Sequence, residues 1–173
     1  MKEFAEWLST TAPSVFIKTQ QAWLIPSIQS IHILAIGIAI GSVFLICLRV
    51  LGLAAMDQTV RQVNRRFFPW LHAAMWVLLA SGALMIVGEP ARELISFSFW
   101  AKMTLLAIGL GTAIAFTSAV RSHETQWDEA LSKRAGVRAM AVVTLVVWLA
   151  VIVCGRLIAY DHIWGALSPA TQY

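Results

Sequence analysis

The segment 24–53 reads LIPSIQSIHILAIGIAIGSVFLICLRVLGL, and it decides the fold class. About 20 consecutive apolar residues are enough for a helix to cross a bilayer. This stretch is longer than that, and its single charged residue, Arg49, stands close to the end of the run. Ala, Leu, Ile and Gly are mixed along it without the strict alternation of a barrel strand, so it predicts a membrane-spanning helix.

Three more apolar runs of spanning length follow, at residues 69–88, 97–120 and 137–160. Of the 173 residues, 59% are hydrophobic and only 13% are charged. A soluble domain of this size cannot bury so much apolar surface, so lipid must cover much of it. The sequence therefore predicts an all-α integral membrane protein, a four-helix bundle that forms one transmembrane domain over residues 1–173.

Basic residues are concentrated in two of the connections between these runs. The first group is Arg49, Arg61, Arg65 and Arg66, and the second is Arg121, Lys133, Arg134 and Arg138. By the positive-inside rule these connections are cytoplasmic, which predicts that both termini face outward. The net charge of +4 then reflects topology and contact with anionic lipid, and it does not indicate a nucleic-acid partner. Before the first span, residues 2–10 place Phe4, Trp7 and Leu8 on one face, which predicts an interfacial helix.

Three polar residues from three different spans are expected in one layer of the bilayer. From the outer side, His32 lies ~12 Å into the first span and Lys102 ~8 Å into the third, at 1.5 Å per residue. Arg156 stands near the outer end of the fourth span. By the same topology, His72 and Arg49 belong to the cytoplasmic half, where Arg49 anchors the inner end of the first span.

Each of these polar residues also has a purely structural interpretation. Lys102 can snorkel, with its stem along lipid and its ammonium group at the headgroups. His32 can be a neutral imidazole hydrogen-bonded to a neighbouring helix. His72 is close enough to the inner interface for a structural role, and His123 and His162, in or beside loops, favour surface roles.

The alternative interpretation is a ligand site for haem. A neutral imidazole is a common donor to haem iron, and a neutral lysine amine can serve as a second axial ligand. His32 and Lys102 would face each other across an apolar slot, and Arg156 would neutralise propionates. One wall of the slot would come from the first span, at Ala35, Ile36 and Ala39. A metal-ion centre has less support, because the sequence contains neither CxxC nor HExxH.

Three stretches carry a resemblance to known proteins. They are WLIPSIQSIHILAIGIAIGSVFLICLRVLGLA at 23–54, FSFWAKMTLL at 97–106 and LVVWLAVIVCGRLIAY at 145–160. Together they resemble a family of small, uncharacterised bacterial four-helix membrane proteins, a domain of unknown function. This resemblance implies a multi-pass protein of the bacterial inner membrane, and the distribution of basic residues then predicts both termini on the periplasmic side.

The chain is also distantly similar to the membrane-bound, oxygen-independent protoporphyrinogen IX oxidases. That family has a histidine early in its first span, an arginine about sixteen residues later, and a Trp-x-x-Lys-like element opening a later span. His32, Arg49 and the FWAKM segment with Trp100 and Lys102 correspond to these features. In that family the histidine and lysine are implicated in binding haem b. Its further histidine, about twelve residues after the lysine, is absent here, where residues 112–116 read TAIAF.

The sequence thus predicts a membrane protein that binds haem b and has a redox or electron-transfer role near the outer face. His32 and Lys102 would be the axial ligands. His72 would be a reserve ligand or the ligand of a second haem, while Arg156 and Arg49 would support the site. Six-coordinate iron leaves no position for oxygen, which favours electron transfer.

Two other classes of function stay open. The first is an enzyme, a tetrapyrrole or quinol oxidoreductase, and the sequence does not decide whether the protein is catalytic. The second is a cofactor-free structural or transport-accessory protein. Expected partners are the lipid bilayer and a quinone or a redox protein. The GxxxG spacing of Gly37 and Gly41 is compatible with a homo-oligomer.

Overall fold

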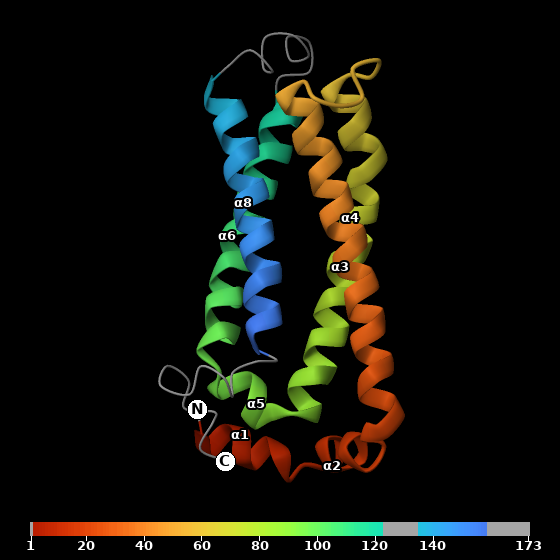
Figure 1. Ribbon diagram of the computed structural model, residues 1–173, viewed down its shortest axis with the longest axis vertical. Helices are drawn as coiled ribbons and strands as arrows, with labels where there is room; N and C mark the ends of the chain where they lie inside the picture. Colours follow the sequence, from red (N-terminus) through yellow and green to blue (C-terminus); the bar gives the residue numbers. More distant parts are fainter. Residues whose placement is uncertain (1, 123–134, 159–173) are drawn as a thin grey trace.

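The computed structural model describes residues 2–122 and 135–158, and for residues 92, 113–122 and 158 it describes the backbone alone. Within these ranges the protein is all-α, with seven helices (Figure 1). The four long helices are α3 (Gln21–Leu51), α4 (Val60–Gly88), α6 (Phe97–Ser122) and α8 (Ala135–Ile158). The three short helices are α1 (Lys2–Ser9), α2 (Ala12–Thr19) and α5 (Pro90–Ile95). The predicted all-α class is confirmed.

Three of the long helices are long and apolar enough to cross a membrane. The qualifying segments are Gln21–Leu51, Val60–Gly88 and Ala135–Leu157. In α6 the apolar segment found among the described residues is Phe97–Thr112, which is shorter than these. The chain therefore has the character of a multi-pass membrane protein, while the fourth span stays a prediction.

The second long helix begins earlier than the sequence indicates. It starts at Val60, whereas the apolar run suggested a start at Pro69, because Thr59 and Gln62 form a capping box. The Thr59 hydroxyl accepts from the Gln62 backbone N–H at 3.1 Å, and the Gln62 side chain accepts from the Thr59 N–H at 2.8 Å. These two bonds satisfy donors that the helix end would otherwise leave open. Polar residues thus extend α4 beyond its apolar part.

The four long helices form two adjacent pairs. In one, α3 packs along α4; in the other, α6 packs along α8; and the two pairs meet mainly between α3 and α8. The buried core between them is built from small and branched side chains together with one indole: Ala39, Val43, Cys47, Val50, Val60, Leu71, Ala74, Ala141 and Trp148. This arrangement agrees with the predicted bundle.

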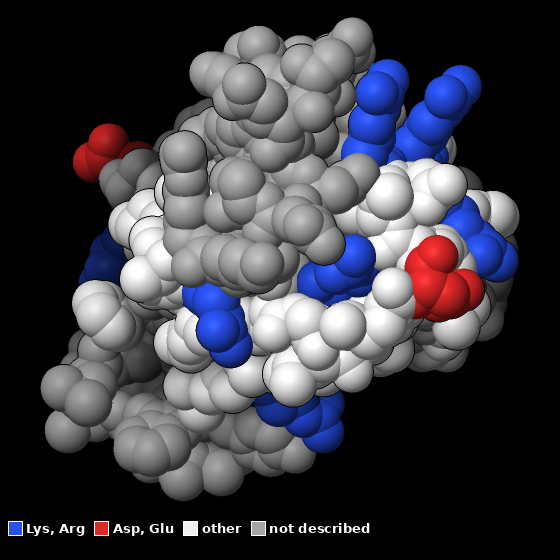
Figure 2. Space-filling model, turned by 90° about the horizontal axis from the view of Figure 1, so that it is seen from above, with Lys and Arg blue, Asp and Glu red and all other residues white. Residues whose placement is uncertain are grey.

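The two ends of the bundle differ in structure. The terminal end is the lower end in Figure 1, where α1 and α2 lie beneath the long helices and α5 connects α4 to α6. There α1 packs on α5, with Ala5 buried against Leu94 and Phe99. The loop end is the opposite one, where residues 52–59 join α3 to α4. In Figure 2 this end shows several Lys and Arg side chains over its described surface.

Candidate functional site

His32 joins α3 to α4 through a side-chain hydrogen bond. Its Nδ1 atom lies 2.7 Å from the Ser81 hydroxyl oxygen. That hydroxyl also lies 2.6 Å from the Val77 carbonyl oxygen, one turn earlier on α4. A serine hydroxyl has one proton to donate, and the carbonyl can only accept. The Ser81 hydroxyl therefore donates a hydrogen bond to the Val77 carbonyl oxygen. The Nδ1–H group of His32 then donates a hydrogen bond to the Ser81 oxygen.

This hydrogen-bond chain fixes the tautomer of a neutral His32. With the proton on Nδ1, the lone pair is on Nε2, the form that a metal-ligating imidazole needs. Within the described part of the chain His32 has no other hydrogen bond, so Nε2 is available as a donor atom. The side chain is partly buried, and Gly82 packs close to it: a Cβ there would lie 3.7 Å from Cε1, an ordinary contact.

Lys102 lies on the other helix pair. It is partly buried on α6, and its Nζ atom stands 5.1 Å from the centre of the Phe99 ring. Its stem passes over Gly155 of α8, where a Cβ would lie 3.6 Å from Cδ. Among the described residues, Nζ makes no hydrogen bond and no ion pair. The amine is thus held in place by its stem and by an aromatic ring.

The charge of Lys102 acts on His32, so the two candidate ligands lie within electrostatic range of each other. They approach from different helix pairs, as a site between two facing helices requires. Of the expected wall on α3, Ala35 and Ala39 are buried and Ile36 is partly buried. These α3 residues therefore belong to the enclosed face of the helix, while the slot itself stays a prediction.

Glu93 is a residue near Lys102 that the sequence analysis did not select. It lies on α5 and is only 5% exposed, although it carries a carboxylate. Its carboxylate lies within electrostatic range of the Lys102 side chain. Glu93 and Lys102 thus form a local set of opposite charges at the terminal end, which favours the structural interpretation of Lys102.

The two candidate arginines lie at opposite ends of the bundle. Arg156 stands in the last turn of α8 and is exposed, at the same end as Lys102. Arg49 stands in the last turn of α3 at the loop end, where its Nε atom donates to the Gln58 carbonyl oxygen. Arg49 therefore orders the α3–α4 connection, and it lies outside the site around His32.

His72 points away from the core. It is exposed on α4, and its ring stacks with Phe68 at a centroid distance of 6.4 Å and meets Trp76 edge-on at 6.2 Å. The structure does not bring it together with His32 or Lys102. As a haem ligand it would serve a second haem on this outer surface of α4. His123 and His162 lie outside the described residues.

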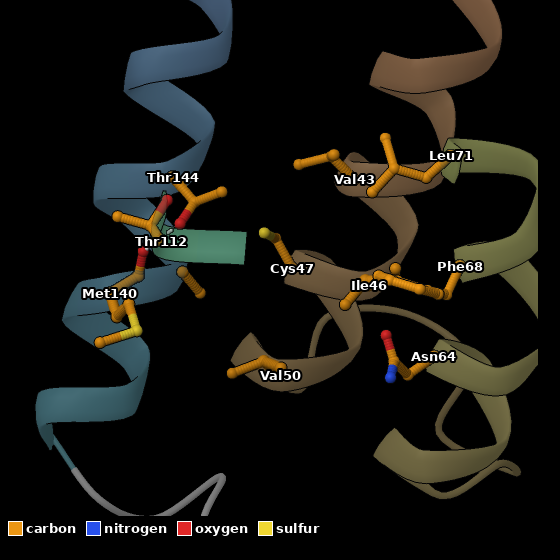
Figure 3. Close-up of a pocket in the computed structure, with 11 residues that line it drawn as sticks. Val43, Ile46, Cys47, Val50, Asn64, Phe68, Leu71, Thr112, Met140 and Thr144 are labelled. Carbon is orange, nitrogen blue, oxygen red and sulfur yellow. Dashed lines mark hydrogen bonds between the residues drawn. The ribbon is translucent and has the colours of Figure 1, made fainter. Parts of the chain in front are cut away.

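A cavity of about 50 Å³ lies in the half of the bundle nearer the loop end (Figure 3). All four long helices contribute to its walls, through Val43, Ile46, Cys47, Val50, Asn64, Phe68, Leu71, Thr112, Met140, Ala141 and Thr144. Cys47 is a free thiol, as is Cys154 on α8. The described residues contain no group of three or more His, Cys, Asp or Glu side chains that would hold a metal ion.

Comparison with known proteins assigns the chain to a family without giving it an activity. Residues 4–161 match the model of a family of unknown function, DUF6644, so the chain belongs to that family. No curated protein and no solved structure matches the chain. The expected relation to a bacterial membrane family of unknown function agrees with this match, whereas no named homologue supports the similarity to protoporphyrinogen IX oxidases.

Proposed function

We propose that the protein binds one haem b at the terminal end of the bundle and transfers electrons there. His32 would be one axial ligand through Nε2, and Lys102 would be the other. The terminal end would face the outside of a bacterial inner membrane, because arginines gather at the loop end. Arg156 stands at the correct end to interact with propionates.

The observation that carries this proposal is the hydrogen bond from His32 to Ser81. Histidines that bind metals usually donate their second ring N–H to an oxygen acceptor, which orients the ring and raises its basicity. His32 has this arrangement within a membrane-spanning helix, where a polar residue otherwise carries a cost in free energy. A glycine packs close to each of the two side chains, Gly82 beside His32 and Gly155 beside Lys102.

Haem would supply a one-electron couple, and the residues of the chain would determine access to it. With His32 and Lys102 on its two faces, the iron would have no open position, which favours electron transfer over oxygen chemistry. Lys102 can act as a ligand only as the neutral amine. Its stem lies on Gly155, and its Nζ atom stands over the Phe99 ring, a contact that attracts the ammonium form, so the amine would have to lose its proton when haem binds.

A second candidate function is a cofactor-free structural or transport-accessory role, and Glu93 is the observation that favours it. A buried carboxylate that acts on Lys102 provides the ammonium group with a partner charge. In that case Lys102 and Glu93 would stabilise the junction between α5 and α6, and His32 would join α3 to α4. An oxidoreductase acting on tetrapyrroles or quinols would require the haem site, and it would also have to show turnover of such a substrate.

The test is a visible absorption spectrum of the detergent-purified protein, oxidised and then reduced with dithionite, after expression with added haem precursor. The proposal expects a Soret band that sharpens on reduction. His32→Ala and Lys102→Ala should each change this spectrum, His32→Ala by loss of the haem and Lys102→Ala by conversion to high-spin iron or by loss. His72→Ala is the matched control, because it removes an imidazole that points away from the core.

The outcomes separate the candidate functions. If the protein elutes as a folded species but develops no bound-haem Soret band during titration with haem in detergent, the haem proposal is wrong and the structural role is the remaining candidate. A band lost in His72→Ala but retained in His32→Ala would place the haem on the outer surface of α4. If the haem is bound, turnover of protoporphyrinogen or quinol distinguishes an oxidoreductase from an electron carrier.

A further inference from the structure

The cavity near the loop end is separate from the proposed haem site. On α4 it extends from Asn64 to Leu71, a rise of ~10 Å along the helix axis. Asn64 lies in the second turn of α4, which begins at Val60 at the loop end. The cavity therefore starts near the membrane surface that carries the arginines and continues toward the middle of the bundle.

The polar groups of this cavity can bind water. Thr112 and Thr144 donate their hydroxyl protons to helix carbonyl groups, at 2.8 Å in each case, so their oxygens remain acceptors. Asn64 has no side-chain hydrogen bond among the described residues, so its amide can both donate and accept. Figure 3 shows the Cys47 sulfur directed toward Thr112 and Thr144, across the cavity from α3.

The size of the cavity also suits water. A water molecule needs about 10–15 Å³ of cavity volume and two to four polar partners. A cavity of about 50 Å³ therefore has room for a few water molecules and is too small for a quinone ring. Asn64 is only partly buried, so water at the loop end can reach its amide and enter the cavity beside it.

We infer that this cavity is a water-filled inlet from the loop end, with Asn64 at its entrance and the Cys47 thiol at its inner wall. It gives water, and with it protons, a path into the half of the bundle opposite the haem site. The inference does not depend on haem binding, because it uses no residue of that site.

The test is hydrogen–deuterium exchange of the Cys47 thiol in the full-length protein, reconstituted in lipid. The variant Cys154→Ser leaves Cys47 as the only thiol, so one S–H stretching band remains in the infrared spectrum. With a water-filled inlet, this band is replaced by the S–D band within the minutes needed to change the solvent to D2O. An S–H band that persists for hours in D2O would overturn the inference.

A second variant tests the entrance. Asn64→Leu replaces the amide by a larger apolar group, and S–H exchange should slow by about tenfold or more, the effect of losing one polar partner for water at a buried site. Ala73→Leu is the matched control, since Ala73 is exposed on the same helix and does not line the cavity. Equal exchange rates in Asn64→Leu and the control would show that water does not enter past Asn64.

Discussion

The imidazole of His32 and the hydroxyl of Ser81, 2.7 Å apart, join the first two long helices at the level of the candidate site. The Ser81 hydroxyl donates its hydrogen bond to the Val77 carbonyl oxygen, so its oxygen accepts from Nδ1 of His32. A neutral His32 then has its lone pair on Nε2. An ordinary packing histidine needs only a partner. Here the partner also leaves Nε2 without a hydrogen bond among the described residues.

The first prediction concerns Ser81. In Ser81→Ala, His32 loses the acceptor that orients its ring, and haem affinity should fall by about 10–100-fold, the usual effect of removing such a partner. A haem titration followed at the Soret band measures the change. Ser30→Ala is the matched control, because Ser30 is exposed on α3 and bonds only to the Pro26 carbonyl. Equal affinity in both variants would contradict the assigned role of Ser81.

The second prediction concerns Gly155 and the position of Lys102. A methyl group at residue 155 would meet Cδ of Lys102 at 3.6 Å, an ordinary contact, so Gly155→Ala should leave the spectrum unchanged. Gly155→Leu should displace the lysine stem and convert the iron toward the high-spin form, as Lys102→Ala does. The measurement is the spin state by electron paramagnetic resonance.

Gly111→Leu controls for the effect of a large residue in a helix of the same pair, because a Cβ there has no neighbour within 4 Å. A low-spin spectrum in Gly155→Leu, identical to that of Gly111→Leu, would show that Lys102 is not the second ligand.

The third prediction concerns Gly88 at the end of α4, where α2 and α3 pack against it. A Cβ at Gly88 would stand 2.9 Å from Cδ1 of Ile25 and 3.0 Å from Cγ2 of Ile17, which is too close for either side chain. Gly88→Ala should therefore destabilise the protein by about 1–3 kcal/mol through overpacking. Thermal unfolding in detergent, followed by circular dichroism, measures the loss. Gly37→Ala, where a Cβ meets nothing within 4 Å, should retain the original melting temperature or exceed it.

The fourth prediction concerns orientation in the membrane. In a chain without its two native cysteines, Asp57→Cys at the loop end should react with an impermeant maleimide only from the cytoplasmic side. Glu3→Cys at the terminal end should react only from the outside. The reason is that the arginines favour retention of the loop end in the cytoplasm, which places the terminal end outside. Both native residues are exposed. If the impermeant maleimide labels Asp57→Cys in intact spheroplasts, the orientation in the membrane is the opposite of the predicted one.

The elements that depend on hydrophobicity could be predicted from the sequence. Apolar runs indicated the long helices, and the one-sided apolar pattern of residues 2–10 indicated the short helix α1 at Lys2–Ser9. The start of α4 at Val60 was missed, because a search for apolar residues does not detect a helix that continues in polar residues beyond the membrane. The signal was present in the spacing of Thr59 and Gln62.

The candidate site was predictable only in part. The depth of His32 and Lys102 was counted along the sequence and stays a prediction. Ser81 could have been found by the same count, because it lies seven residues, or ~10 Å, from the end of α4 and so at the level of His32. Glu93 could not, because its proximity to Lys102 depends on how α5 folds beneath the long helices. Likewise, the outward direction of His72 depends on the rotation of α4 about its axis.

The division of the long helices into two pairs has a consequence for assembly. Each pair would contribute one of the two axial ligands, so the iron would cross-link two halves of the chain that otherwise meet mainly between α3 and α8. Haem concentration would then govern the cohesion of the bundle by mass action, adding about 2.7 kcal/mol when free haem exceeds its dissociation constant a hundredfold. A cell short of haem would contain the same chain with its two halves less firmly associated, and that species would be the first target for a membrane protease.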